Sequence, residues 1–368
     1  MMLDNAKKPI VLGVDIRDLR IAQTGARTYL TELLQQWQSL PSLNLVVLDT
    51  QYKVYTGKNK WWKLMEHLRF IWWKQIQLPI LAKRKGVTHL FCSDFFVPYW
   101  KRGLKTIAVL HDAFFWESPE HYHPLWLSLF HYLGVPAAKK ADLLIVPTEA
   151  AKKAILNKED FDDSKMKVVW EANKTFVNTK ILPNKITSPY FLHVGVLEKR
   201  KNLVRLVKAF AKVHVQYPAY KLVLVGNTPV KFSLNDAPAI NQAIQSLGLQ
   251  DSVIQLGYLE ADELASIYHH AFAYYLSSLN EGFGLPILEA FYFKLPLISA
   301  KTSALPEVAG DAALFVDPLN ENEMAEAMIQ LIDQPSLKQE LINKGQQRLS
   351  LFSWQKSAQE ICDLIKDC

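Results

Sequence analysis

The sequence predicts an α/β protein built from two doubly wound parallel sheets, and three observations lead to this prediction. Apolar segments with the composition of strands alternate with amphipathic helical segments, which is the pattern of βαβ units. The 368 residues exceed what one hydrophobic core usually organises, while the apolar content of 49% is that of an ordinary globular protein. A polar, proline-bearing stretch without a clear period interrupts the alternation between residues 179 and 189.

The strands of the first sheet are expected at five apolar segments, which are residues 10–15, 45–48, 88–92, 106–110 and 143–147. The strands of the second sheet are expected at six segments, which are residues 190–195, 221–226, 253–257, 273–276, 297–300 and 313–316. We therefore expect an amino-terminal domain over residues 1–180, a linker over residues 181–189 and a carboxy-terminal domain over residues 190–351.

The sequence lacks the signals of several other protein classes. No uninterrupted apolar run reaches about 18 residues, and the first residues do not show the charged-then-apolar pattern of a signal peptide, so we expect a cytoplasmic protein. Three cysteines occur without the spacing of a zinc site or a disulfide framework. The absence of G-x-G-x-x-G after the first strand and of G-x-x-x-x-G-K-[ST] anywhere disfavours a dehydrogenase and a P-loop NTPase.

The most informative segment covers residues 281–289 and reads Glu-Gly-Phe-Gly-Leu-Pro-Ile-Leu-Glu. Gly282 and Gly284 allow a close approach of the backbone to a ligand, and Pro286 suits the first position of a helix. The unpaired N–H groups and the positive dipole end of that helix favour an anion such as a diphosphate. Glu289 then lies in the first turns of the helix, where its carboxylate can accept hydrogen bonds from sugar hydroxyl groups. The segment therefore predicts a site for a phosphorylated sugar.

Longer stretches around this segment resemble the retaining glycosyltransferases of family 4, and among them the polysaccharide mannosyltransferases. The resemblance is free of gaps from Leu279 to Ala313, and it extends to residues 194–203, where a glycine is followed by a basic pair and Asn-Leu. It is weaker at His111-Asp112 and in the amino-terminal region up to Gly25. It implies the GT-B fold, in which two Rossmann-like domains face each other across a cleft and the last helix, here residues 352–368, returns to the first domain.

The resemblance also implies roles for individual residues. In the second domain, Lys201 with Arg200 would stabilise the departing diphosphate, Glu289 would hold the donor ribose, and Glu281 with the following backbone would hold the transferred sugar. His111 of the first domain would contact the donor sugar or the acceptor. The implied catalytic residues are His111, Arg200, Lys201 and Glu281, and the implied donor-binding residues are Gly25, Gly195, Gly282, Phe283, Gly284, Leu285 and Glu289.

Two positions depart from the family pattern. Val196 follows Gly195 where many members have an arginine, which shifts the phosphate-binding role to Arg200 and Lys201. Arg27 stands where a second glycine is common, so a close approach of the backbone to a ligand is expected only at Gly25.

The implied reaction is the transfer of a sugar with retention at the anomeric carbon, through an oxocarbenium-like transition state. The donor would be a GDP- or UDP-sugar, GDP-mannose among them, and the acceptor a saccharide of cell-surface polysaccharide or lipopolysaccharide biosynthesis. Because the predicted cleft elements carry no Asp-x-Asp motif, we expect catalysis without a metal and without any cofactor. A GT-B sugar phosphorylase, a nucleotide-sugar epimerase and a catalytically silent nucleotide-sugar-binding protein stay open as alternatives.

A basic, tryptophan-rich segment between Lys53 and Lys85 contains nine lysines and arginines against one acid. Its two tryptophan pairs are Trp61-Trp62 and Trp72-Trp73. They lie eleven residues apart, about three helical turns, and would share one face of a helix. Tryptophans flanked by cations suit an anionic membrane surface, which predicts a peripheral protein at the inner face of the membrane with a lipid-linked saccharide acceptor. The alternative is that this face packs into the first domain. Basic charge with aromatic residues could also suggest nucleic-acid binding, but the sequence contains no recognised nucleic-acid-binding motif.

Overall fold

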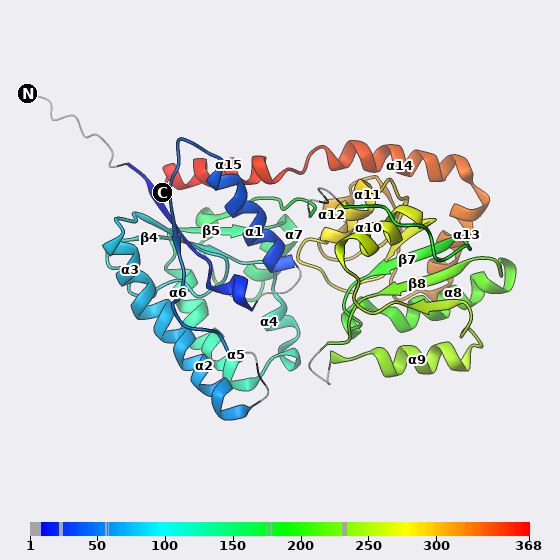
Figure 1. The fold of residues 1–368 in the computed structure, drawn as a ribbon, viewed down its shortest axis with the longest axis horizontal. Coiled ribbons are helices and arrows are strands. Elements are labelled where there is room, and N and C mark those ends of the chain that lie inside the picture. The colour runs from blue at the N-terminus through cyan, green and yellow to red at the C-terminus, as the bar shows by residue number, and fades with distance from the viewer. Residues whose placement is uncertain are drawn as a thin grey trace, which may run out of the picture. The chain divides into compact units, whose positions relative to one another are not determined.

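The computed structural model describes residues 9–21, 25–55, 57, 59–174, 176, 179–229 and 234–368. The chain forms two compact units (Figure 1). The first unit comprises Met1–Pro147, Ala151–Glu171 and Trp354–Cys368, and the second comprises Thr148–Ala150 and Ala172–Ser353. The predicted linker, residues 181–189, is included in the second unit, where the Leu182 N–H donates to Ser266 Oγ at 2.6 Å.

Each unit contains a six-stranded parallel sheet, which confirms the predicted fold class. The first sheet has the order β2-β1-β3-β4-β5-β6. Its strands are β1 (Val11–Asp15), β2 (Asn44–Leu48), β3 (His89–Cys92), β4 (Lys105–Val109), β5 (Leu143–Val146) and β6 (Met166–Val168). The sequence did not predict β6.

The second sheet has the order β12-β11-β10-β7-β8-β9. Its strands are β7 (Tyr190–Val194), β8 (Lys221–Val225), β9 (Val253–Gln255), β10 (Ala273–Leu276), β11 (Leu297–Ala300) and β12 (Ala313–Val316). The predicted strands of both sheets agree with the observed ones to within two residues at each end. This agreement has a simple cause: β5, β10 and β11 are buried at every position, so they stand out as continuous apolar runs.

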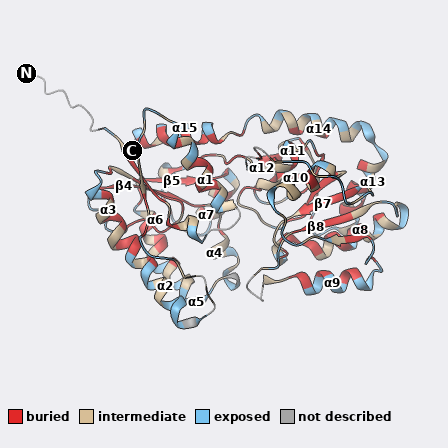
Figure 2. Ribbon diagram, in the orientation of Figure 1, coloured by how far each residue is buried: buried red, intermediate tan, exposed pale blue. Residues whose placement is uncertain are grey.

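Helices connect the strands in both units. In chain order they are α1 (Gly25–Gln38), α2 (Lys60–Trp72), α3 (Leu78–Arg84), α4 (Phe114–Glu117), α5 (Pro124–Leu129), α6 (Val135–Lys139), α7 (Glu149–Leu156), α8 (Leu203–Gln216), α9 (Ala237–Ser246), α10 (Ala261–His270), α11 (Leu285–Tyr292), α12 (Leu305–Ala309), α13 (Glu321–Asp333), α14 (Pro335–Leu349) and α15 (Trp354–Lys366). A π-helical segment, η2 (Trp73–Gln77), continues α2, and a 3-10 turn, η6 (Lys199–Lys201), precedes α8. Figure 2 shows the strands largely buried and the helices exposed on their outer sides.

The strand orders locate the ligand-binding edge of each sheet. In open α/β sheets, ligands bind outside the carboxyl ends of the strands where the strand order reverses. This point lies between β1 and β3 in the first sheet and between β7 and β10 in the second. Candidate site residues should therefore follow these four strands.

Candidate functional site

The predicted basic pair and the first predicted acid meet at the switch point of the second sheet. Arg200 and Lys201 belong to η6, which follows β7, and Glu281 follows β10. Lys201 Nζ lies 2.6 Å from Glu281 Oε1, and Arg200 Nη1 lies 2.8 Å from Glu281 Oε2. The two carboxylate oxygens thus face one cation each. Arg200 Nε also lies 2.5 Å from Glu198 Oε1, so two cations and two acids form this group, which we call the Glu281 cluster.

Burial and neighbouring charges have opposite effects on the pKa values of Glu281 and Lys201. Burial by itself would raise the pKa of the Glu281 carboxyl, but the charges of Lys201 and Arg200 outweigh it and hold that pKa well below its usual range. Burial lowers the pKa of the Lys201 ammonium, and Glu281 works against this lowering. Glu281 is therefore ionised at neutral pH. Arg200 has the most exposed side chain of the three, so it is the cation that an incoming anion can reach first.

Gly195 lies directly beside a buried histidine, His193, which was not among the predicted site residues. A Cβ atom at Gly195 would lie 3.3 Å from His193 Nε2 and 3.4 Å from Lys201 Cε. His193 Nδ1 lies 3.0 Å from the Tyr275 carbonyl oxygen, to which it must donate, while Nε2 has no hydrogen-bond partner among the described residues. Burial, with the Lys201 charge, lowers the pKa of His193 to about 4. A polar residue inside the apolar strand 190–195 was the signal that could have identified it.

The glycine loop leads directly into α11, as the sequence predicted. Gly284 precedes the helix with φ of 99°, and a Cβ atom there would lie 2.8 Å from Leu305 Cδ2, so both conformation and space require glycine. The Glu281 N–H donates to Ser303 Oγ at 3.0 Å, which fixes the start of the loop. Phe283 is buried and its ring lies edge-on to Phe352. The amino end of α11 and the Glu281 cluster are thus joined by three residues of chain.

Glu289 lies in the first turns of α11 and contacts a buried tyrosine. The Tyr268 hydroxyl donates to Glu289 Oε2 at 2.7 Å, whereas Oε1 accepts no hydrogen bond from the described residues. Burial raises the pKa of the Glu289 carboxyl. The ring of Tyr268 stacks on Tyr274, whose hydroxyl donates to the Val194 carbonyl oxygen beside Gly195. This chain of contacts connects Glu289 with the end of β7, and no local sequence pattern predicted Tyr268 or Tyr274.

His111 of the first unit follows β4, and both of its ring nitrogens face oxygen atoms. Nδ1 lies 3.4 Å from Glu171 Oε1, and Nε2 lies 3.2 Å from the Ser93 carbonyl oxygen. Burial by itself would lower the pKa of the imidazole, but the hydrogen bond and charge of Glu171 outweigh it and raise that pKa. The Tyr29 ring packs edge-on against His111 at 5.0 Å between centroids. A sugar that binds His111 would have to replace one of these oxygen contacts.

Gly25 is the first residue of α1, and Arg27 lies exposed two residues later. Gln23 and Thr24, which precede Gly25 in the predicted loop, lie outside the described residues. His111 and Gly25 belong to the first unit, whereas the other predicted site residues belong to the second.

The tryptophans of the basic segment are divided between the surface and the core. Trp61, Trp62 and Trp72 are exposed by 67%, 48% and 55%, whereas Trp73 is exposed by 3%. Trp73 Nε1 donates to Asp15 Oδ1 at 3.1 Å, so this ring packs against the end of β1. The alternative of packing into the domain is therefore correct for Trp73, and the prediction that both tryptophan pairs share one face is wrong for this residue. The other three tryptophans are exposed, and their contact with a membrane stays a prediction.

Within the part of the chain that the structure describes, no three His, Cys, Asp or Glu side chains are grouped so that they could hold a metal ion. None of the described helices has the length and apolar character needed to cross a bilayer.

Comparison with known proteins gives one family and several relatives. Residues 177–348 match the family Glycosyl transferases group 1. O-antigen chain mannosyltransferase B of Escherichia coli is 28% identical over 178 residues, which are 48% of this chain and 45% of that protein. O-antigen chain mannosyltransferase RfbU of Salmonella typhimurium is 29% identical over 202 residues, which are 54% of this chain and 53% of that protein. The chain thus spans about half the length of these curated relatives.

Solved structures share the fold over nearly the whole chain. Sucrose-phosphate synthase of Thermosynechococcus elongatus has a TM-score of 0.76 at 17% identity, covering 97% of this chain and 98% of its own. HepE of Anabaena, in complex with UDP-glucose, has a TM-score of 0.75 at 16% identity, covering 98% of this chain and 100% of its own. At these identities the likeness establishes the GT-B fold.

Proposed function

We propose, from the glycosyl transferases group 1 domain that residues 177–348 form, that the protein is a retaining glycosyltransferase which moves a hexose from a nucleotide-sugar to a saccharide. The observation that carries this proposal is the Glu281 cluster at the switch point of the second sheet. It combines two cations with the amino end of a helix, which is what a departing diphosphate requires.

The charge that develops in the reaction explains the arrangement of this cluster. As the bond between the anomeric carbon and the diphosphate breaks, negative charge grows on the diphosphate oxygens. Arg200, Lys201 and the positive dipole end of α11 are positioned before the reaction and can stabilise that charge without rearrangement. Glu281 holds both cations in place through its two oxygens and, with the backbone from Gly282 to Leu285, contacts the transferred sugar. Neither Glu281 nor Glu289 is assigned the role of a nucleophile.

Glu289 is proposed to hold the ribose of the donor. Its Oε2 accepts the Tyr268 hydroxyl, which leaves Oε1 for a ribose hydroxyl. His111 of the first unit keeps its predicted role as a contact to the reacting sugars. We assign no metal to this mechanism, since Arg200, Lys201 and the helix end supply the positive charge.

The donor and the acceptor are proposed from the relatives. The names of both O-antigen chain mannosyltransferases support mannose as the transferred hexose. We propose GDP or UDP as its carrier. A lipid-linked saccharide in cell-surface polysaccharide synthesis is the proposed acceptor. The exposed Trp61, Trp62 and Trp72 among lysines and arginines support a location at the inner face of the cytoplasmic membrane.

Donor binding provides the test of this function. The melting temperature of the purified protein would be measured with GDP-mannose, GDP-glucose, UDP-glucose and UDP-galactose, each with and without EDTA. Stabilisation by one nucleotide class, unchanged by EDTA and lost in Lys201→Ala but kept in Lys199→Ala, is the expected result. Conversion of the donor into a second nucleotide-sugar would indicate an epimerase, and sugar release that needs only phosphate would indicate a phosphorylase; either result overturns the proposal.

A further inference from the structure

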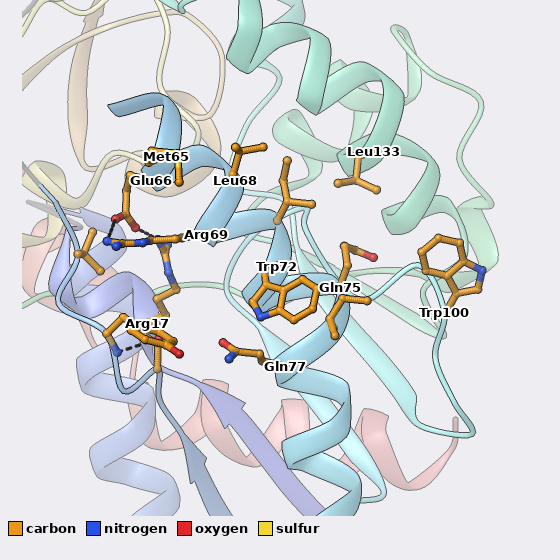
Figure 3. Close-up of a pocket in the computed structure, with 15 residues that line it drawn as sticks. Arg17, Met65, Glu66, Leu68, Arg69, Trp72, Gln75, Gln77, Trp100 and Leu133 are labelled. Carbon is orange, nitrogen blue, oxygen red and sulfur yellow. Dashed lines mark hydrogen bonds and ion pairs between the residues drawn. The ribbon is translucent and has the colours of Figure 1, made fainter. Parts of the chain in front are cut away.

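A cavity of about 790 Å³ lies in the first unit beside α2 and η2 (Figure 3). Pockets that bind small molecules usually measure about 300–1,000 Å³ and have mostly apolar walls. The apolar wall of this cavity includes Met65, Leu68, Trp72, Ile76, Trp100 and Leu133. None of the residues implied for the donor site lines it. The cavity is therefore separate from the Glu281 cluster and needs its own explanation.

One end of the cavity carries charge. Of the charged residues that line it, two are arginines, Arg17 and Arg69, and one is an acid, Glu66. Figure 3 shows these three together at one end, with Trp100 and Leu133 at the other. Arg17 follows β1, at the switch point of the first sheet, where open α/β sheets bind ligands. The charged side chains thus lie at the sheet edge. The rest of the wall is mostly apolar, although Gln75 and Gln77 also line it.

The guanidinium of Arg17 is only partly satisfied. Its side chain is 4% exposed, and Nη2 donates to Glu66 Oε1 at 2.6 Å. Nη1 has no hydrogen-bond partner among the described residues, and Asp18 Oδ1 lies 3.9 Å away. A buried guanidinium N–H without a partner is costly, and phosphate oxygens match its planar geometry. Arg69 is the more exposed cation at the same end, 3.9 Å from Glu66 Oε2.

An exposed apolar stripe on α2 leads into the cavity. Trp61, Met65, Leu68 and Trp72 are spaced by four, three and four residues, so they lie on one face of the helix. Met65, Leu68 and Trp72 line the cavity, and Trp61, Leu68 and Trp72 are exposed to solvent. Contiguous exposed apolar surface of this kind marks a binding or membrane-contact site. A molecule with a long apolar body could pass from a membrane surface along this stripe.

We propose that this cavity binds a phosphorylated lipid, with its phosphate at Arg17 and Arg69 and its hydrocarbon chain along Met65, Leu68 and Trp72 toward Trp100. One cationic end and a mostly apolar wall match a ligand that has one anionic head and one apolar chain. The inference rests on the proposed function, because such a lipid would be the carrier of the saccharide acceptor. It adds to that function a defined site for the carrier.

Three probe molecules distinguish the contribution of the phosphate from that of the hydrocarbon chain. Binding of farnesyl monophosphate, farnesol and inorganic phosphate to the full chain would be measured by calorimetry below the micelle concentration. Farnesyl monophosphate should bind, farnesol should bind about tenfold or more weakly because it lacks the phosphate, and inorganic phosphate should also bind about tenfold or more weakly because it lacks the hydrocarbon chain. Equal affinity for farnesol and farnesyl monophosphate would overturn the role of the arginines, and equal affinity for inorganic phosphate and farnesyl monophosphate would overturn the lipid.

Matched variants on α2 test the location. Leu68→Asp should weaken farnesyl monophosphate about tenfold, whereas Leu64→Asp, an exposed residue of the same helix outside the cavity, should change it by less than about twofold. Arg69→Gln should weaken binding and Lys63→Gln should not. These positions are exposed, so the variants should fold. Equal effects within each pair, or a dimer of the wild type that Leu68→Asp dissociates, would overturn the proposal.

A measurement of donor binding distinguishes a failure of the lipid site from a failure of the proposed function. Stabilisation by the nucleotide-sugar should be the same in Leu68→Asp as in the wild type. If the donor binds and is transferred to a soluble saccharide while farnesyl monophosphate does not bind, only the lipid site is wrong. If no nucleotide-sugar stabilises the protein, the proposed function fails, and the lipid measurement still reports on the cavity.

Discussion

Each unit places a buried lysine near the switch point of its sheet, and the two lysines differ in their neighbours. Lys201 of the second unit faces one acid, Glu281, and has Arg200 beside it. Lys74 of the first unit is 1% exposed and faces acids only, which are Asp15 Oδ2 at 2.8 Å, Asp94 Oδ1 at 3.1 Å and Asp18 Oδ2 at 3.9 Å.

This difference in charge balance separates a structural lysine from a lysine suited to bind an anion. Three acids outnumber the single charge of Lys74, and Lys74 is not among the residues that line the cavity of the first unit, so its ammonium is closed to ligands. The Glu281 cluster has as many cations as acids, and Arg200 remains partly exposed. Lys201 follows β7, whereas Lys74 belongs to η2 between β2 and β3, so the two lysines reach the switch points of their sheets from different elements. A buried lysine near a switch point can therefore serve stability in one unit and is proposed to serve binding in the other. Four changes test this comparison, from the largest expected effect to the smallest.

Lys74→Ala should lower the free energy of unfolding by about 3–5 kcal/mol, because it leaves Asp15 and Asp94 buried without their cation. Urea denaturation measures this loss, and the exposed Lys83→Ala provides the control. A Lys74→Ala protein as stable as the control would show that the cluster does not hold the first unit together.

Lys201→Ala should reduce turnover about 100-fold or more, since it removes a preorganised positive charge from the leaving diphosphate. Steady-state transfer from the donor found by thermal stabilisation measures this effect, with Lys199→Ala as the neighbouring exposed control. Urea denaturation of the same variants separates the two roles. Full turnover in a Lys201→Ala protein that only unfolds more easily would make Lys201 a structural lysine like Lys74.

Acid should destabilise the second unit through His193. Its pKa is about 4 in the folded state and about 6.5 when exposed, so the unfolded chain binds more protons between these values. Stability is therefore fully present above pH 6.5 and is lost as the pH falls toward 4, by at most about 1.4 kcal/mol per pH unit.

Urea denaturation of the wild type and of His193→Gln between pH 7 and 4 measures this loss. The variant should have the smaller slope, since the titrating group is gone. Identical slopes would show that the pKa of His193 does not differ between the folded and unfolded states.

Glu289→Gln should weaken the nucleotide-sugar by about 1.5–3 kcal/mol, because a charged acceptor for the ribose hydroxyl is replaced by a neutral one. The glutamine can still accept the Tyr268 hydroxyl, so folding should change little. Calorimetric titration of the donor provides the measurement, with Tyr268→Phe as the comparison. Unchanged affinity in Glu289→Gln would remove Glu289 from the donor site.

The sequence by itself determined both sheets and most of the candidate donor residues. The strands were visible because parallel strands covered on both faces are continuous apolar runs, and this pattern depends only on local backbone geometry. The loop from Gly282 to Leu285 could also be predicted from local sequence. A glycine allows the positive φ of Gly284, and the proline that follows suits the start of α11. Of the described strands, only β6 was not predicted, although β9, which also has three residues, was.

The tertiary structure decided which distant residues meet. The contact of Lys201 with Glu281 joins positions 80 residues apart, and it exists because β7 and β10 are neighbours in the sheet. The buried state of Trp73, beside the exposed Trp72, depends on the end of β1 lying next to η2. Neither outcome can be found from local periodicity, since strand order and packing partners are set by the burial of apolar surface across the whole unit.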